Sequence, residues 1–158
     1  MNQALVCCLV TALALGHFQI ATAAQGKGLL IVNQPWARPA SVGQTTEVYM
    51  DITSTAGATL VAAASDAAAV ARLRSRDRQH VKSPTIALPA GIVVALTPGS
   101  NRVVLLRLNR SLRLGDRVLL TLTIEHADAS RQEVAVDAEV RLHSPIDDEL
   151  HAHRHAVH

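Results

Sequence analysis

The sequence has 158 residues, of which 49% are hydrophobic and 18% charged, and its 15 Lys and Arg against 13 Asp and Glu give a net charge of +2. This length suits one domain with short tails. The hydrophobic fraction excludes a wholly disordered chain, and the even charge balance excludes a protein built to coat nucleic acid. The two cysteines, Cys7 and Cys8, are adjacent, which excludes a disulfide framework and a zinc site of the CxxC kind.

The first apolar segment predicts export from the cytoplasm. Residues 4–15 form an uncharged run, and Ala-Thr-Ala-Ala at 21–24 is a small-residue stretch of the kind that signal peptidase cleaves. The run is shorter than the roughly 18 to 20 residues that a membrane-spanning helix needs. We therefore predict a signal peptide over residues 1–24, no stable membrane anchor, and a mature protein in the periplasm or secreted. Lipid anchoring at Cys7 would leave almost no apolar segment upstream.

Apolar and polar residues alternate with period two through much of the body, residues 25–142, and this pattern predicts β-strands. Turn sequences with Gly, Pro and Asn separate the apolar runs. Eight or so short strands at this spacing indicate an all-β antiparallel sandwich or barrel. An Ala-rich stretch has helical propensity, but it is short and its neighbours alternate like strands. The residues expected to face the core are Val48, Met50, Ile52, Val118, Leu120, Leu122, Val134, Val136 and Val140.

A row of arginines follows the Ala-rich stretch. Its members recur at every second position, so on a strand they would project from one face. The simpler interpretation is a solvated strand edge that deters aggregation. The alternative is a site for an anion or an acidic partner, because the guanidinium fork pairs with carboxylate and phosphate. The row consists of Arg72, Arg74, Arg76 and Arg78.

The C-terminal tail, residues 143–158, differs from the body because it is rich in histidine. Ser144 followed by Pro145 is typical of a helix start. On such a helix one carboxylate and three imidazoles would share a face, and this set suits Cu(II), Zn(II) or Ni(II) better than Cu(I). The alternative is a flexible, solvated end. The candidate ligands are Asp147, His151, His155 and His158, with His143 and His153 nearby.

Several motifs along the body occur in the order and spacing of a known family: Pro35-Trp36-Ala37-Arg38, Val48-Tyr49-Met50-Asp51-Ile52, Leu88-Pro89-Ala90-Gly91, Leu96-Thr97-Pro98-Gly99 and Leu112-Arg113-Leu114-Gly115-Asp116. From about Ile31 to Val140 the chain resembles the periplasmic copper chaperones of the PCu(A)C type. The resemblance implies a cupredoxin-like β-sandwich that carries copper towards the copper centre of cytochrome c oxidase. It also implies that the assembly factors of that centre are partners.

The copper ligands of that family do not carry over to this sequence. The resemblance implies two His and two Met around Cu(I), and it maps their positions onto Arg74, His80, Arg102 and Val104. Of these, only His80 can coordinate a metal. Cu(I) prefers thioether and imidazole ligands, whereas arginine is always protonated and only donates hydrogen bonds. We therefore predict that the inherited site is degenerate, and that Arg102 lies beside the arginine row.

Three classes of function follow from these patterns. The first is a copper-chaperone-like protein whose ligands lie in the tail. The second is an interaction module that binds an anionic group or acidic partner through Arg72, Arg74, Arg76, Arg78 and Arg102. An enzyme is not expected, because the sequence contains no GxSxG nucleophile motif and no phosphate-binding glycine loop.

Overall fold

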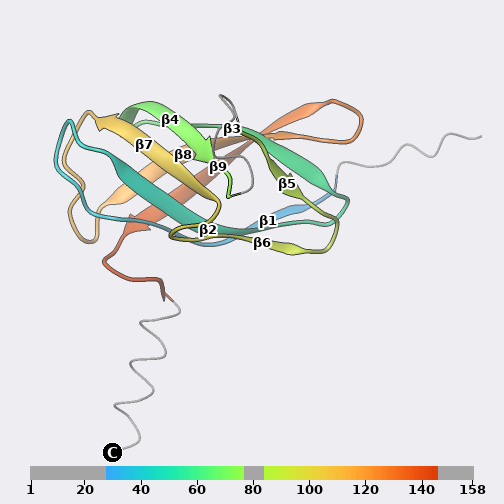
Figure 1. Cartoon of the computed structure of the whole chain (residues 1–158), viewed down its shortest axis with the longest axis horizontal. Coiled ribbons are helices and arrows are strands. Elements are labelled where there is room, and N and C mark those ends of the chain that lie inside the picture. The colour runs from blue at the N-terminus through green and yellow to red at the C-terminus, as the bar shows by residue number, and fades with distance from the viewer. Residues whose placement is uncertain (1–27, 77–83, 146–158) are drawn as a thin grey trace, which may run out of the picture.

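Strands make up most of the part of the chain that this computed structural model describes, residues 28–76 and 84–145. The predicted all-β fold is confirmed. Figure 1 shows the strands in two layers, with β8 and β9 passing behind β4 and β7. The strands in these residues are β1 (Leu30–Ala37), β2 (Thr46–Ser54), β3 (Ala58–Ser65), β4 (Ala68–Arg74), β5 (Ile86–Leu88), β6 (Val93–Leu96), β7 (Arg102–Leu108), β8 (Arg117–Glu125) and β9 (Arg131–Val140).

The strands form one sheet that folds back on itself. Its order is β4-β7-β2-β1-β9-β8-β3-β5, and β6 pairs with the second half of β2. β3 and β4 stand far apart in this order but pack against each other. The sheet thereby encloses a core between its two layers, as in a β-sandwich. No helix within residues 28–76 and 84–145 is long and apolar enough to cross a membrane.

One strand pair differs from the predicted antiparallel arrangement. β1 and β9 run parallel, with Trp36 opposite Glu139 and Ala37 opposite Val140. Every other pair of named strands is antiparallel. Parallel neighbours need a long connection, and here the whole chain between the first and last strands supplies it. Alternation along a strand shows which face is buried and says nothing about the direction of the neighbour.

The predicted core residues face the interior, with one exception. Val48, Ile52, Val118 and Leu122 are all 0% exposed, and the other predicted members are nearly so. Val134 is only partly buried and packs against the edge of the core. The central cluster of the core contains no aromatic side chain and consists of Ala, Val, Leu and Ile with Met50, so its stability depends on close packing of these side chains. Its other large, fully buried members include Leu60, Leu88, Leu96, Leu105 and Ile124.

The Ala-rich stretch forms strands, with a turn at Asp66 and Ala67 between β3 and β4. Ser65 Oγ accepts a hydrogen bond from the backbone N–H of Ala67 at 3.2 Å. Asn109 Nδ2 donates to the carbonyl oxygen of Asp66 at 2.6 Å. β3 pairs with β8, and β4 pairs with β7. This pairing overrides the helical propensity of alanine, because a helix as short as this stretch would be only marginally stable without tertiary packing.

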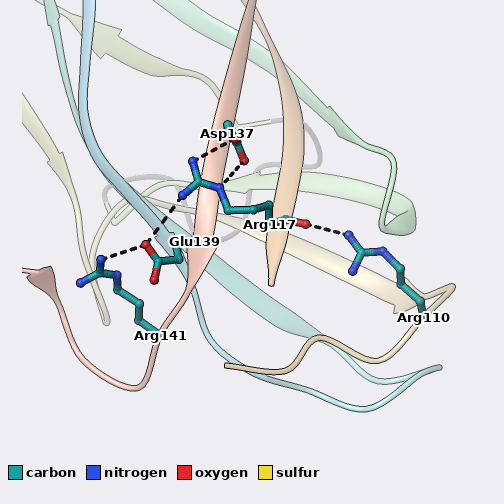
Figure 2. A network of polar contacts seen from close by, with 5 residues as sticks. All are labelled: Arg110, Arg117, Asp137, Glu139 and Arg141. Atoms are coloured by element: carbon teal, nitrogen blue, oxygen red, sulfur yellow. Dashed lines mark hydrogen bonds and ion pairs between the residues drawn. The ribbon is translucent and has the colours of Figure 1, made fainter. Parts of the chain in front are cut away.

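An ion-pair network lies on the exposed side of the β8–β9 hairpin (Figure 2). Arg117 donates from Nε and Nη2 to the two carboxylate oxygens of Asp137, at 3.0 and 2.9 Å. Glu139 lies between Arg117 and Arg141, with its Oε2 atom 3.7 Å from the Nη1 of Arg117 and 2.8 Å from the Nη2 of Arg141. Exposed ion pairs contribute little to stability, so this network adds little to the free energy of folding.

Candidate functional site

The arginine row faces solvent on one side of β4 and of the two residues that follow it. Arg72, Arg74 and Arg76 are exposed, whereas Leu73 and Ser75 between them are buried. The period-two arrangement thus holds over the described part of the row. Arg78, its predicted fourth member, lies outside the described residues.

Arg102 on β7 lies directly opposite Arg74, and Val104 lies opposite Arg72. Opposite residues in an antiparallel pair project from the same face, so the two arginines point to the same side of the sheet. The structure therefore brings together three of the four positions that the resemblance assigns to copper ligands. The fourth, His80, lies outside the described residues. A cleft of about 310 Å³ opens here, lined by Arg74, Ser75, Gly99 and Arg102.

Glu47 on β2 is the acidic side chain that faces this cluster. Its Oε1 atom accepts a hydrogen bond from Nε of Arg102 at 2.7 Å, and its Oε2 atom accepts one from the hydroxyl of Tyr49. Burial raises the pKa of Glu47, but the hydrogen bonds from Tyr49 and Arg102 and the charges of Arg102 and Arg38 outweigh burial and hold that pKa below 4.5. Glu47 is therefore ionised at neutral pH and offsets the charge of Arg102.

Two aromatic side chains extend the same face towards β1. The rings of Trp36 and Tyr49 have centroids 4.7 Å apart, and the guanidinium carbon of Arg38 lies 5.9 Å from the centroid of the Tyr49 ring. Burial and the hydrogen bond to Glu47 raise the pKa of Tyr49, so its hydroxyl remains protonated and donates. These side chains form a layer on the face of the sheet opposite the core, in which Trp36 and Tyr49 are buried. Its members are Arg74, Arg102, Glu47, Tyr49, Trp36 and Arg38.

The sequence patterns did not predict this layer, because its residues lie on, or directly after, four strands, β1, β2, β4 and β7. Glu47 and Arg102 are 55 positions apart in the chain. A compositional signal did exist, since Trp36 and Tyr49 are the only tryptophan and tyrosine of the sequence. Single large aromatics in a chain with so few of them indicate a specific contact, and both residues stood in the motifs quoted above.

The described residues hold few metal ligands. No group of three or more His, Cys, Asp or Glu in residues 28–76 and 84–145 is arranged to hold a metal ion. His126 pairs through Nε2 with Oε1 of Gln132 at 3.0 Å, and His143 is exposed. The remaining predicted tail ligands lie outside the described residues: Asp147, His151, His153, His155 and His158. Their role as ligands stays a prediction.

The C-terminal segment leaves the body beside the aromatic pair. Ser144 lines a cavity of about 90 Å³ together with Trp36, Tyr49, Thr97 and Pro98. Pro98 immediately precedes Gly99, which lines the arginine cleft. The chain therefore passes beside the residue that precedes Gly99 just before residue 146.

A folded-over sheet of this order, with an outer layer where β2, β4 and β7 meet, is the fold of a PCu(A)C-type domain with a cupredoxin-like arrangement. The chain belongs to the family described as "Putative lipoprotein LpqE-like", which matches residues 30–140. The predicted resemblance to PCu(A)C proteins and the predicted fold class are thereby confirmed. The description of this family names a lipoprotein, whereas the sequence of this chain predicts no stable membrane anchor. The cysteines that could carry a lipid, Cys7 and Cys8, lie outside the described residues.

Solved structures of PCuAC domains are similar to this chain. The apo PCuAC domain from PmoF1 is 26% identical, with a TM-score of 0.64, and the match covers 72% of this chain and 94% of that domain. The Cu(I) form of DR1885 from Deinococcus radiodurans is 27% identical, with a TM-score of 0.52, over 77% of this chain and 85% of that one.

A third structure supports the fold alone. The copper-bound PCuAC domain from PmoF2 is 22% identical with a TM-score of 0.59, and the match covers 72% of this chain and 93% of that domain. No curated protein matches the chain in sequence.

Proposed function

We propose that this protein is a copper-chaperone-like protein that works outside the cytoplasm and holds its metal away from the arginine cleft. The observation that carries the proposal is the likeness of the body, in fold and in sequence, to the PCuAC domain of PmoF1 and to Cu(I)-bound DR1885. Both likenesses cover more than two thirds of this chain. The predicted signal peptide supports a place in the periplasm or beyond it.

The charge of the cleft supports placing the metal elsewhere. Arg74 and Arg102 lie side by side on one face of the sheet, where the resemblance puts two histidine ligands, and both guanidinium groups are fixed cations. Val104 offers no donor atom at the position of the second methionine. A copper ion at this point would meet two positive charges and, among the described residues, no group of three or more His, Cys, Asp or Glu arranged to hold it.

The tail is the proposed source of ligands. His151, His155 and His158 each offer one neutral nitrogen near pH 7, and Asp147 adds a negative charge. His143, His153 and His80 are additional candidates. Imidazole and carboxylate favour Cu(II), with Zn(II) as the alternative ion. The proposed recipients are the factors that assemble the copper centre of cytochrome c oxidase.

Replacing His151, His155 and His158 together by alanine in the full mature chain is expected to abolish Cu(II) and Zn(II) uptake. The reason is that three of the four proposed ligands disappear, while the strands of the body are untouched. Equilibrium dialysis followed by metal analysis measures the uptake, and circular dichroism checks the fold. A matched control changes Ala152, Ala156 and Val157 to serine, which alters the same segment without removing an imidazole.

Undiminished uptake by the histidine variant would contradict the tail as ligand source. Equal loss in the serine control would do so as well, because the effect would then come from the segment and not from imidazole. If neither the wild type nor any variant takes up Cu(I), Cu(II) or Zn(II), the copper-chaperone-like function itself is wrong.

Metal affinity is expected to fall as the pH drops below about 6.5, the ordinary pKa of histidine. Only neutral imidazole coordinates, so protons compete with the metal for each nitrogen. Titrations of the mature protein with Zn(II) between pH 5 and pH 8 measure this dependence. An affinity that stays constant over this range would mean that the ligands are not histidines.

The mature protein is expected to begin at or near Gln25 and to carry no lipid. The mass of the intact protein, purified from an exporting bacterium, decides this point. A mass that includes a diacylglyceryl group would contradict the predicted absence of an anchor.

A further inference from the structure

The arginine cleft between β4 and β7 carries an excess of positive charge. Arg74 and Arg102 are directly opposite in the strand pair, and like charges in this position destabilise a sheet. Glu47 offsets only Arg102, through the 2.7 Å contact with Nε. Within residues 28–76 and 84–145, Arg74 makes no hydrogen bond or ion pair through its guanidinium group. One of the two charges is therefore uncompensated by the described part of the chain.

The donors in the cleft are arranged for an oxygen-rich anion. Arg102 uses Nε for Glu47 and Nη1 for the carbonyl oxygen of Ser100, at 2.8 Å, which leaves Nη2 available. These two contacts fix the guanidinium plane of Arg102 before any ligand arrives. Arg74 offers all its donors from the neighbouring strand. Two guanidinium groups side by side, one of them held in place, match the several acceptor oxygens of one anion.

The cleft also has room for such a group. Its volume is about 310 Å³, and Gly99 at its rim has a positive φ of 77° with no atom within 4 Å of the place where a side chain would begin. A carboxylate can therefore reach the arginines from the Pro98–Gly99 side without displacing backbone.

We propose that the cleft lined by Arg74, Ser75, Gly99 and Arg102 binds a carboxylate-type anion. Binding of the anion offsets the repulsion between the two arginines. It needs no metal, so a test of this proposal is independent of copper binding. The carboxylate has two potential sources. One is the acidic run of this chain at residues 147–149, which begins three positions after Ser144, a residue that shares a cavity with Pro98, the neighbour of Gly99. The other is an acidic group on a separate molecule.

The test uses the full mature chain without metal and citrate as the probe, at constant ionic strength. The Nε–H signals of Arg74 and Arg102 in ¹H–¹⁵N spectra are expected to shift and saturate with citrate. Arg74→Gln is expected to weaken the affinity at least about tenfold, since it removes the donor that has no other partner. Arg113→Gln, a change at an arginine in the connection between β7 and β8, is the matched control and is expected to leave the affinity unchanged.

A second variant distinguishes the two sources of carboxylate. In the full chain, Asp147→Asn, Asp148→Asn and Glu149→Gln together remove the acidic run. If that run occupies the cleft, the Arg74 and Arg102 signals move without any probe and citrate binds several-fold more tightly. If the ligand belongs to another molecule, neither the signals nor the affinity change, and citrate still binds the wild type.

Two results would overturn the proposal. The first is a chemical-shift change that rises linearly with citrate concentration, without saturation, and is equal in the wild type and in Arg74→Gln. Such a change would reflect only the screening of surface charge. The second is the absence of any response in both the wild type and the variant without the acidic run.

Discussion

Replacing Leu122 by alanine is expected to lower the free energy of unfolding by about 2–5 kcal/mol. Leu122 is 0% exposed at the centre of β8, with Ala63 of β3 on one side and Val134 of β9 on the other. Alanine leaves a cavity there, and close-packed neighbours on paired strands collapse into it only partly. The melting temperature should fall by on the order of 10 °C for a domain of this size.

The matched control for this substitution lies on the same strand. Leu119 is 55% exposed and projects from the opposite face of β8. Leu119→Ala is expected to change the unfolding free energy by no more than about 0.5 kcal/mol. Urea unfolding followed by circular dichroism measures both variants. Equal losses at Leu119 and Leu122 would contradict the assignment of the two faces of β8.

The second large effect is expected at Glu47. Glu47→Ala removes the acceptor of the Tyr49 hydroxyl and the partner of Arg102. Tyr49 is 1% exposed, so its hydroxyl group has little access to water as a replacement. We expect a loss of about 1–3 kcal/mol at pH 7, the usual cost of a buried polar group left without its partner. Urea unfolding of the variant beside the wild type measures it.

Glu133→Ala is the control for the glutamate change. Glu133 is an exposed residue of β9 that forms no ion pair within the described part of the chain. Its replacement is expected to cost no more than about 0.5 kcal/mol. If Glu133→Ala costs as much as Glu47→Ala, the network around Tyr49 contributes nothing specific.

The effect of Glu47 should depend on pH in a defined direction. Its pKa is lower in the folded protein than the ordinary 4.5, so the unfolded chain takes up its proton first as the pH falls. The stability that the ionised carboxylate contributes is thus fully present above pH 4.5 and is lost as the pH falls through the folded pKa. The stability difference between wild type and Glu47→Ala should shrink correspondingly in unfolding curves below that pH. A difference that stays constant down to pH 3 would contradict this linkage.

Local patterns in the sequence determined which residues form strands and which face is buried. Val48, Ile52 and Leu122 are core residues because period two places every second side chain on the same face, and this property needs only neighbouring residues. The arginine row on β4 follows from the same rule. Its relation to Arg102 was expected only from the resemblance to the PCu(A)C family.

Only the tertiary structure decided which residues of distant strands contact each other. The parallel contact of Trp36 with Glu139 brings together the two ends of the body, and the contact of Glu47 with Arg102 crosses from β2 to β7. Such contacts depend on the order and direction of strands that are far apart in the chain, which alternation does not encode. The sequence thus determined by itself that this protein is an all-β domain with an exposed arginine row. Only the folded sheet decided that Glu47 of β2 meets Arg102 and offsets its charge but not that of Arg74, because long-range strand pairing sets which side chains meet.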